Sequence, residues 1–341
     1  MRKKLTSYLL MAFLLMTTLS GCAGGTGESS GDNSSKEPTY GGSVVVGIQQ
    51  DVDSLDPHKA TAAGTKEILF NIFEGLVKPD ENGNLMNAVA SDYKISEDGL
   101  VYTFTLRENV KFHNGNVVTA EDVEYSLKRA SGLLDGTPLI SALSAITSVD
   151  IIDPKTVQVT VGSANTELIY SFVAAIIPKG SGEDANADPV GTGPFSFVSY
   201  APQEGIVLAK NANYWQEGLP YLDKVEFKNV NSPDTALLNL QGGSIDIYPY
   251  LTDSQANELK GKGSFQILSA PSDVVQALFL NNAVKPLDDV RVRQAMLYGM
   301  DREMILEQLL KGHGEVVDGF LSSASPFFDD SIEPVAYNPE K

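Results

Sequence analysis

Three histidines are the side chains best suited to acid–base or metal chemistry near neutral pH. His58 follows an Asp-Pro turn, His113 lies in a Phe-His-Asn-Gly turn, and His313 stands between two glycines. None has a metal-ligating partner at the i, i+4 spacing, and the chain contains no nucleophile elbow, phosphate loop or dinucleotide fingerprint. The sequence therefore predicts neither an enzyme nor a bound cofactor. A metal site formed by His58 with Asp53 or Asp56 is the alternative that these residues leave open.

The polar loop over residues 50–64 is the strongest candidate for a binding site. It carries Asp53, Ser54 and Asp56, and it connects a β-branched apolar run to the helix expected from Thr65. Loops at strand ends that face a crevice between lobes are where open α/β folds bind ligands. The alternative is a solvated acidic loop in which Asp56 begins a turn at the following proline.

Cys22 is the only cysteine, and its position suggests lipid modification rather than redox chemistry. Three basic residues at 2–4 precede an apolar stretch over 9–19, which is too short to span a bilayer as a mature helix. The segment closes on Leu-Ser-Gly-Cys, which resembles a bacterial lipobox. We expect residues 1–21 to be a signal peptide and the Cys22 sulfur to carry a diacylglycerol. An ordinary cleaved signal followed by a chance cysteine is the alternative.

The composition excludes some partners and sets the number of lobes. The chain has 25 Lys+Arg against 44 Asp+Glu, and its formal net charge of -19 disfavours nucleic-acid binding. Residues 22–39 are rich in Gly, Ser and acidic side chains, so we expect a flexible tether. The signal, the lipid site and the tether together predict that the folded part lies outside the cytoplasmic membrane. About 300 residues remain, which exceeds a usual single core, so two lobes are expected.

Hydrophobic periodicity predicts a mixed α/β protein without strict alternation of strands and helices. The expected strands are 43–48, 100–106, 156–161 and 224–230. The expected helices are 66–76, a segment capped by Thr119, a segment from Pro233 to Leu240 capped by Ser232, a segment after Asp288 and Asp289, and a segment from Asp301 to Gly312.

Several motifs together resemble one protein family. The run SDYKISEDGLVYTFTLRENVKFHNG over 91–115 continues into VTAEDV over 118–123, and this long block resembles the signature of the family 5 extracellular solute-binding proteins. Further matches occur in the order found in that family: DSLDPH at 53–58, VGTGPF at 190–195 followed by NYW at 213–215, and LDDVRVRQAM at 287–296 followed by MDR at 300–302. The family binds dipeptides, oligopeptides, nickel complexes and some sugars.

The resemblance implies a two-lobed α/β fold of the periplasmic-binding-protein type, class II with an extra subdomain. The first lobe would cover 40–272, with the inserted subdomain at about 79–189. The second lobe would begin with 273–341, entered through a hinge strand over 275–281. Family chains run on for a further stretch, so an incomplete second lobe is expected.

The resemblance also implies where a solute binds. The loop after the first strand and the start of the next helix would line the cleft, which adds Gly64 and Thr65 to Asp53 and Ser54 as ligand-binding candidates. Asn281 would contribute from the second lobe after the hinge.

The function implied is that of a monomeric, lipid-anchored solute-binding component of an ABC importer. It would capture a short peptide and deliver it to the permease and ATPase complex, on the cell membrane facing the periplasm or a Gram-positive cell surface. A nickel complex, an oligosaccharide, or a role as a peptide-sensing surface lipoprotein are the alternatives.

Overall fold

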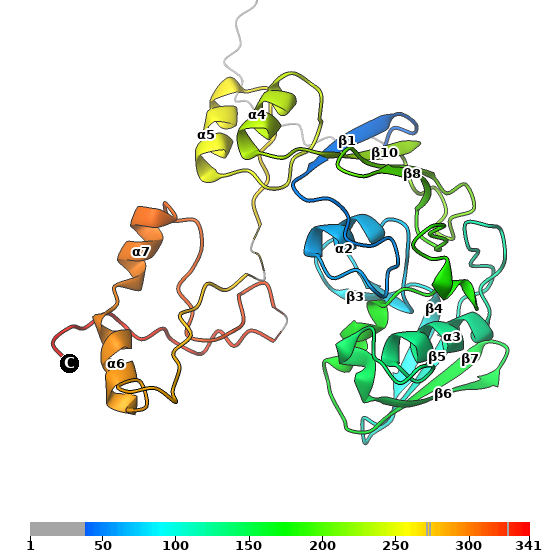
Figure 1. Ribbon diagram of the computed structural model, residues 1–341, viewed down its shortest axis with the longest axis horizontal. Helices are drawn as coiled ribbons and strands as arrows, with labels where there is room; N and C mark the ends of the chain where they lie inside the picture. Colours follow the sequence, from blue (N-terminus) through cyan, green and yellow to red (C-terminus); the bar gives the residue numbers. More distant parts are fainter. Residues whose placement is uncertain (1–37, 271, 273, 326) are drawn as a thin grey trace, which may run out of the picture. The chain divides into compact units, whose positions relative to one another are not determined.

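The computed structural model describes residues 38–270, 272, 274–325 and 327–341. The expected signal peptide, Cys22 and nearly all of the expected tether lie outside these described residues. Residues 40–341 cluster into one unit of contacts, and Figure 1 labels its α-helices and most of its strands.

A first sheet contains the strand that leads into the candidate loop. Its order is β1-β10-β9-β8, with β1 parallel to β10 and the other pairs antiparallel. Its strands are β1 (Ser43–Ile48), β8 (Phe195–Ala201), β9 (Gly205–Lys210) and β10 (Lys224–Asn229). The chain at 245–248 lies along the other side of β1, because the backbone amides of Asp246 and Ile247 donate to the Val45 carbonyl. Both sides of β1 are therefore paired.

A second sheet, entirely antiparallel, has the order β4-β5-β7-β6. Its strands are β4 (Ala90–Ile95), β5 (Val101–Leu106), β6 (Ile146–Asp153) and β7 (Thr156–Val161), and a short hairpin of β2 (Val77–Pro79) and β3 (Leu85–Asn87) precedes them. The alternation expected in β5 is present, because Tyr102, Phe104 and Leu106 are buried in one hydrophobic core. Helix α3 (Ala120–Ser131) packs on β6 and β7 in that core (Figure 1).

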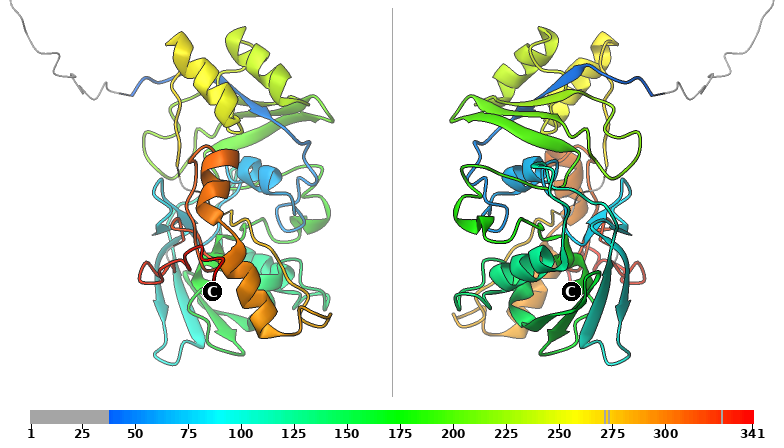
Figure 2. Two further views of the ribbon diagram at one scale, coloured as in Figure 1. Left: turned by 90° about the vertical axis from the view of Figure 1, so that its left-hand side faces the viewer. Right: turned by 90° about the vertical axis from the view of Figure 1, so that its right-hand side faces the viewer.

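The remaining helices start and stop largely where local signals predict. They are α2 (Ala63–Leu69), α4 (Pro233–Gln241), α5 (Asp253–Lys262), α6 (Val290–Gly299) and α7 (Arg302–Leu309). Short 3₁₀ turns occupy η1 (Ser141–Ala145), η2 (Leu168–Val173) and η3 (Ser181–Glu183). Thr119, Ser232, Asp289 and Asp301 are all N-caps, as expected. Helices α4 and α5 lie side by side over their own small core (Figure 2).

The helix expected over 66–76 is shorter than predicted, because α2 ends at Leu69. The apolar stripe is nevertheless correct, since Ile68, Ile72 and Leu76 are all buried. Beyond the helix the backbone takes tertiary partners: the Leu76 amide donates to the Phe172 carbonyl at 3.0 Å, and the Ile72 carbonyl accepts from the Gly193 amide at 2.9 Å. These bonds replace the ones that a continued helix would make.

The hinge strand expected over 275–281 is not formed, because residues 274–281 have no regular secondary structure. Leu278 and Phe279 within it are 62% and 80% exposed. A strand is stable only when a neighbouring strand pairs with it, and none of the described residues does so here.

In the described part of the chain, no helix has the length and apolar character needed to cross a membrane.

Candidate functional site

The loop after β1 is closed into a ring by one carboxylate. Asp53 Oδ2 accepts hydrogen bonds from the Thr61 amide at 2.9 Å, the Thr61 hydroxyl at 2.7 Å and the Ala62 amide at 3.0 Å. The Asp53 amide donates in turn to Thr65 Oγ1 at 3.1 Å. Desolvation opposes ionisation, but these hydrogen bonds outweigh it and hold the pKa of Asp53 well below its usual value. Asp53 is therefore ionised at neutral pH and joins the start of the loop to the start of α2.

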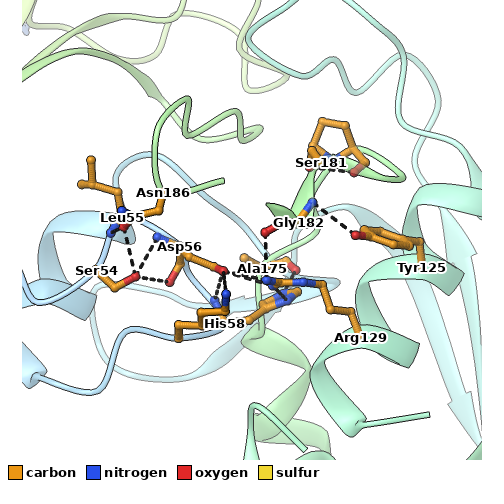
Figure 3. A network of polar contacts seen from close by, with 12 residues as sticks. Ser54, Leu55, Asp56, His58, Tyr125, Arg129, Ala175, Ser181, Gly182 and Asn186 are labelled. Atoms are coloured by element: carbon orange, nitrogen blue, oxygen red, sulfur yellow. Dashed lines mark hydrogen bonds and ion pairs between the residues drawn. The ribbon is translucent and has the colours of Figure 1, made fainter. Parts of the chain in front are cut away.

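The next turn of the loop is attached to a distant segment. Asn186 Oδ1 accepts from the Leu55 amide at 2.7 Å and from the Ser54 hydroxyl at 3.3 Å, while Ser54 Oγ accepts from the Asp56 amide at 3.0 Å (Figure 3). Ser54 thus holds the conformation of the loop as well as standing at its surface.

Thr65 and Gly64 begin α2 beside two tyrosines. Thr65 is buried, and a Cβ placed on Gly64 would lie 3.9 Å from the Tyr250 hydroxyl. That hydroxyl donates to Glu67 Oε2 at 2.7 Å. Burial, followed by this contact, raises the pKa of Tyr250 to about 12.

Tyr248 and Tyr250 are thus neighbours of the candidate loop that the sequence reasoning missed. Tyr248 accepts a hydrogen bond from Gln49 Nε2 at 2.8 Å, and the two tyrosine rings meet edge to face. The signal available in the sequence was the run Asp-Ile-Tyr-Pro-Tyr after the Gly242-Gly243 helix stop. Only the pairing of 245–248 with β1 places that run at the loop.

A buried ionic network joins the loop to α3 (Figure 3). Arg129 of α3 donates from Nη2 to Asp56 Oδ2 at 2.6 Å and from Nη1 to Asp56 Oδ1 at 3.1 Å, a two-pronged ion pair. Burial raises the pKa of Asp56, but the hydrogen bonds and charge of Arg129 outweigh that effect and lower it below the ordinary value.

His58 completes this network, and its ring is fully occupied. Its Nε2 lies 2.8 Å from the Ala175 carbonyl oxygen, and its Nδ1 lies 2.9 Å from Arg129 Nη1. A carbonyl only accepts and a guanidinium only donates, so the ring must be neutral, with its proton on Nε2. Burial lowers the pKa of His58 to about 4. The metal site considered for His58 is therefore not supported, because both ring nitrogens already have partners.

The described residues contain no group of three or more His, Cys, Asp or Glu side chains placed to hold a metal ion. His113 also serves the scaffold: its Nε2 lies 3.1 Å from the Gly193 carbonyl oxygen, and its Nδ1 accepts from the Gly191 amide at 3.3 Å.

Trp215 belongs to the scaffold as well. Its Nε1 donates to the buried carboxylate of Glu74 at 2.7 Å, which also accepts from Thr192. The Arg107 guanidinium lies 4.2 Å from the Trp215 ring centroid, and the Lys78 ammonium lies 5.0 Å from it. A ring packed in this way is not available as a platform for a sugar.

The structure brings together Asp53, Ser54, Gly64 and Thr65 in and after one loop, but it gives no bond between that loop and Asn281. Asn281 is exposed, and its Oδ1 accepts from the Ala283 amide at 3.0 Å in a local turn. Among the described residues, no hydrogen bond links Asn281 to residues 49–65. Its role in binding stays a prediction.

Comparison with known proteins identifies the family. The family described as bacterial extracellular solute-binding proteins, family 5 Middle, matches residues 84–341. The chain belongs to this family, which confirms the resemblance carried by the motifs.

Individual relatives agree with this assignment. The glutathione-binding protein GsiB of Salmonella typhi is 28% identical over 305 residues, covering 87% of this chain and 59% of that protein. The chain thus spans about three-fifths of the length of that curated relative.

Solved structures confirm the α/β fold of the periplasmic binding proteins. The oligopeptide-binding protein AppA of Bacillus subtilis, in complex with a nonapeptide, is 27% identical with a TM-score of 0.70, covering 89% of this chain and 63% of that one. NikZ of Campylobacter jejuni, in complex with Ni(L-His), is 26% identical with a TM-score of 0.71, covering 81% and 56%.

Proposed function

We propose that this protein is the solute-binding component of an ABC importer and that its ligand is a short peptide. Family membership supports the binding role. The relatives GsiB and AppA, which bind glutathione and a nonapeptide, support a peptidic ligand, while NikZ keeps a nickel complex as the second candidate.

The choice of a peptide over the other ligands rests on the hydrogen bonds of His58 and on the cations packed over Trp215. His58, the histidine of the loop, has both ring nitrogens occupied, which disfavours a nickel complex held by that side chain. The only tryptophan has two cations over its ring, which disfavours a sugar platform. The loop itself is fixed by Asp53, Ser54 and Thr65, so it presents a preorganised surface to a ligand.

We further propose that Asp53, Ser54, Gly64, Thr65 and Asn281 line the ligand cleft, and that Tyr250 and Glu67 stand at its edge beside Gly64. The lobes would divide the chain at about 272, with the inserted subdomain over about 79–189, and would close on the ligand by a hinge motion. The protein would act as a monomer held to the membrane through Cys22.

Isothermal titration calorimetry on the purified protein tests the ligand. The panel contains di-, tri-, penta- and nonapeptides, glutathione, the nickel–L-histidine complex and maltotriose. We expect saturable heat with at least one peptide and none with maltotriose. Heat with maltotriose alone would contradict the peptide assignment and leave the binding role intact, and heat with the nickel complex alone would favour the second candidate.

The importer role is tested separately by uptake. Deleting the gene should abolish accumulation of the labelled peptide that binds, and restoring it should recover that uptake. Binding without any effect on uptake would favour a peptide-sensing surface lipoprotein.

A further inference from the structure

We infer that Arg129 is a positioning residue for ligand binding: from helix α3 it fixes the 54–56 turn of the loop that follows β1. The inference rests on the proposed function for its last step, the effect on a bound peptide. Its first step, control of the loop conformation, concerns the unliganded protein alone.

One guanidinium holds two segments that are far apart in the sequence. Its two terminal nitrogens engage both carboxylate oxygens of Asp56, and Nη2 also donates to the Gly182 carbonyl at 3.1 Å. Arg129 is 9% exposed and Asp56 is 1% exposed, so water does not replace these bonds readily. Arg129 therefore connects the loop after β1 to the turn at 181–186.

Both of these segments determine where Ser54 and Leu55 lie. Asp56 Oδ1 accepts from the His58 amide, and the Asp56 carbonyl accepts from the amides three and four residues beyond Asp56. From the other side, Asn186, four positions after Gly182, accepts from the Ser54 hydroxyl and the Leu55 amide. A change at Arg129 thus loosens the turn from both of its attachments, although Arg129 itself belongs to α3.

Gly182 packs closely against Arg129. A Cβ added to Gly182 would lie 2.4 Å from Arg129 Nε and 2.6 Å from the Tyr125 hydroxyl, which itself accepts from the Gly182 amide. Replacing Gly182 with alanine must therefore shift the side chains of Arg129 and Tyr125 or the backbone at residue 182, without altering any charge. This gives a second route to the same perturbation.

The geometry of the site is specific to arginine. Lysine would keep one positive charge next to Asp56, but its single ammonium lacks the planar fork that reaches two carboxylate oxygens, the Gly182 carbonyl and His58 Nδ1 together. Arg129→Lys should therefore retain the fold but lose some of the bonds that the guanidinium makes to Asp56, Gly182 and His58.

Hydrogen exchange on the unliganded protein tests the first step. We compare wild type with Arg129→Lys, Gly182→Ala and Leu143→Ala. The last variant is a control, because it creates a cavity in the core of the second sheet away from the loop. The expected result is that both network variants raise exchange at the amides of residues 55, 56, 59 and 60 by about tenfold, the equivalent of one lost charged hydrogen bond. Leu143→Ala should lower the midpoint of thermal unfolding without this local increase.

Calorimetry with the tightest peptide of the panel tests the second step, well below the unfolding midpoint of every variant. Arg129→Lys and Gly182→Ala should weaken the dissociation constant by about tenfold, whereas Leu143→Ala should leave it unchanged despite an equal or larger loss of stability. If Arg129 only stabilised the fold, its variants would change the dissociation constant no more than Leu143→Ala does at an equal loss of stability.

The outcomes distinguish this inference from the proposed function. Unchanged exchange at 55–60 in both network variants overturns the inference. Raised exchange with an unchanged peptide dissociation constant also overturns it, because the turn would then not matter for the ligand. If no peptide binds the wild-type protein, the proposed function fails, and the exchange measurement still decides whether Arg129 holds the loop.

Discussion

At the scale of single residues, His58 gives the protein a defined response to acid. Its ring is neutral in the folded state and its pKa is lowered to about 4 from 6.5. The unfolded chain binds the proton of His58 more tightly than the folded chain. The contribution of neutral His58 to the free energy of unfolding is therefore complete above about pH 6.5 and is lost as the pH falls toward 4. The loss should reach about 3 kcal/mol in the free energy of unfolding.

Urea denaturation between pH 7.5 and 4.5 measures this effect by comparing wild type with His58→Gln. Glutamine offers an amide donor group and a carbonyl acceptor but does not titrate. The free energy of unfolding of this variant should therefore decline less than that of wild type over this range. The pKa of His113 is also lowered by burial, but it contributes equally to both proteins and cancels in the difference. Parallel pH profiles would show that His58 does not titrate as the geometry requires.

Also at the residue scale, Cys22 is expected to attach the protein to the membrane. Three acyl chains, or two, provide stable anchoring, since each buried methylene contributes about 0.8 kcal/mol. Cys22→Ser should therefore move the protein from the membrane pellet to the soluble fraction or the medium. Detergent-phase partitioning and mass analysis of the mature N-terminus provide the measurement. The anchor would be refuted if Cys22→Ser stayed on the membranes and the N-terminus of the wild-type protein carried no diacylglycerol.

At the scale of elements, the bend at 191–194 supports the segment that follows α2. A Cβ on Gly191 would lie 2.1 Å from the Ile72 carbonyl oxygen, and one on Gly193 would lie 2.5 Å from the Asn71 carbonyl oxygen. Two stretches of backbone meet here with no space for a side chain. Gly191→Ala should therefore lower the free energy of unfolding by about 3 kcal/mol or more, because backbone must shift.

Gly261 provides a matched control for that variant. It lies inside helix α5, and a Cβ there would meet nothing within 4 Å. Gly261→Ala should leave stability unchanged or raise it by up to about 1 kcal/mol. Chemical denaturation of both variants gives the comparison, and equal effects would mean that the close approach at Gly191 is relieved at little cost.

At the scale of the whole molecule, the burial of apolar side chains is unevenly distributed. The described residues beyond 272 include no buried hydrophobic residue, and Ser322 is the only buried residue among them. Leu309 and Phe320, for example, are 73% and 76% exposed. Helices without a buried apolar face gain little stability from tertiary packing.

Limited proteolysis of the 341-residue chain should therefore cut first between about 263 and 290 and leave a resistant fragment that begins near residue 40. Mass spectrometry identifies the cleavage sites, and binding of a hydrophobic dye should decrease when the C-terminal residues are removed. First cleavage within the second sheet, over 90–161, would contradict this distribution of stability.

The sequence by itself determined the elements whose signals are local. Thr119 caps α3 through a reciprocal pair of bonds with Asp122, and Ser232 with the following proline starts α4, because caps depend on residues three positions apart. The alternation in β5 follows from one buried face. The family followed from long motifs in a fixed order, and the loop that carries Asp53 and Ser54 followed from its place after the first strand.

The tertiary structure alone decided how these pieces meet. Asp56 and Arg129 are 73 positions apart, and Glu67 and Tyr250 are 183 apart, so no local pattern reports either pair. The end of α2 at Leu69 depends on backbone bonds to Phe172 and Gly193 that no helical periodicity encodes. For the same reason the sequence suggested His58 as a metal ligand: its two partners come from α3 and from residue 175, and only the folded chain brings them to the ring.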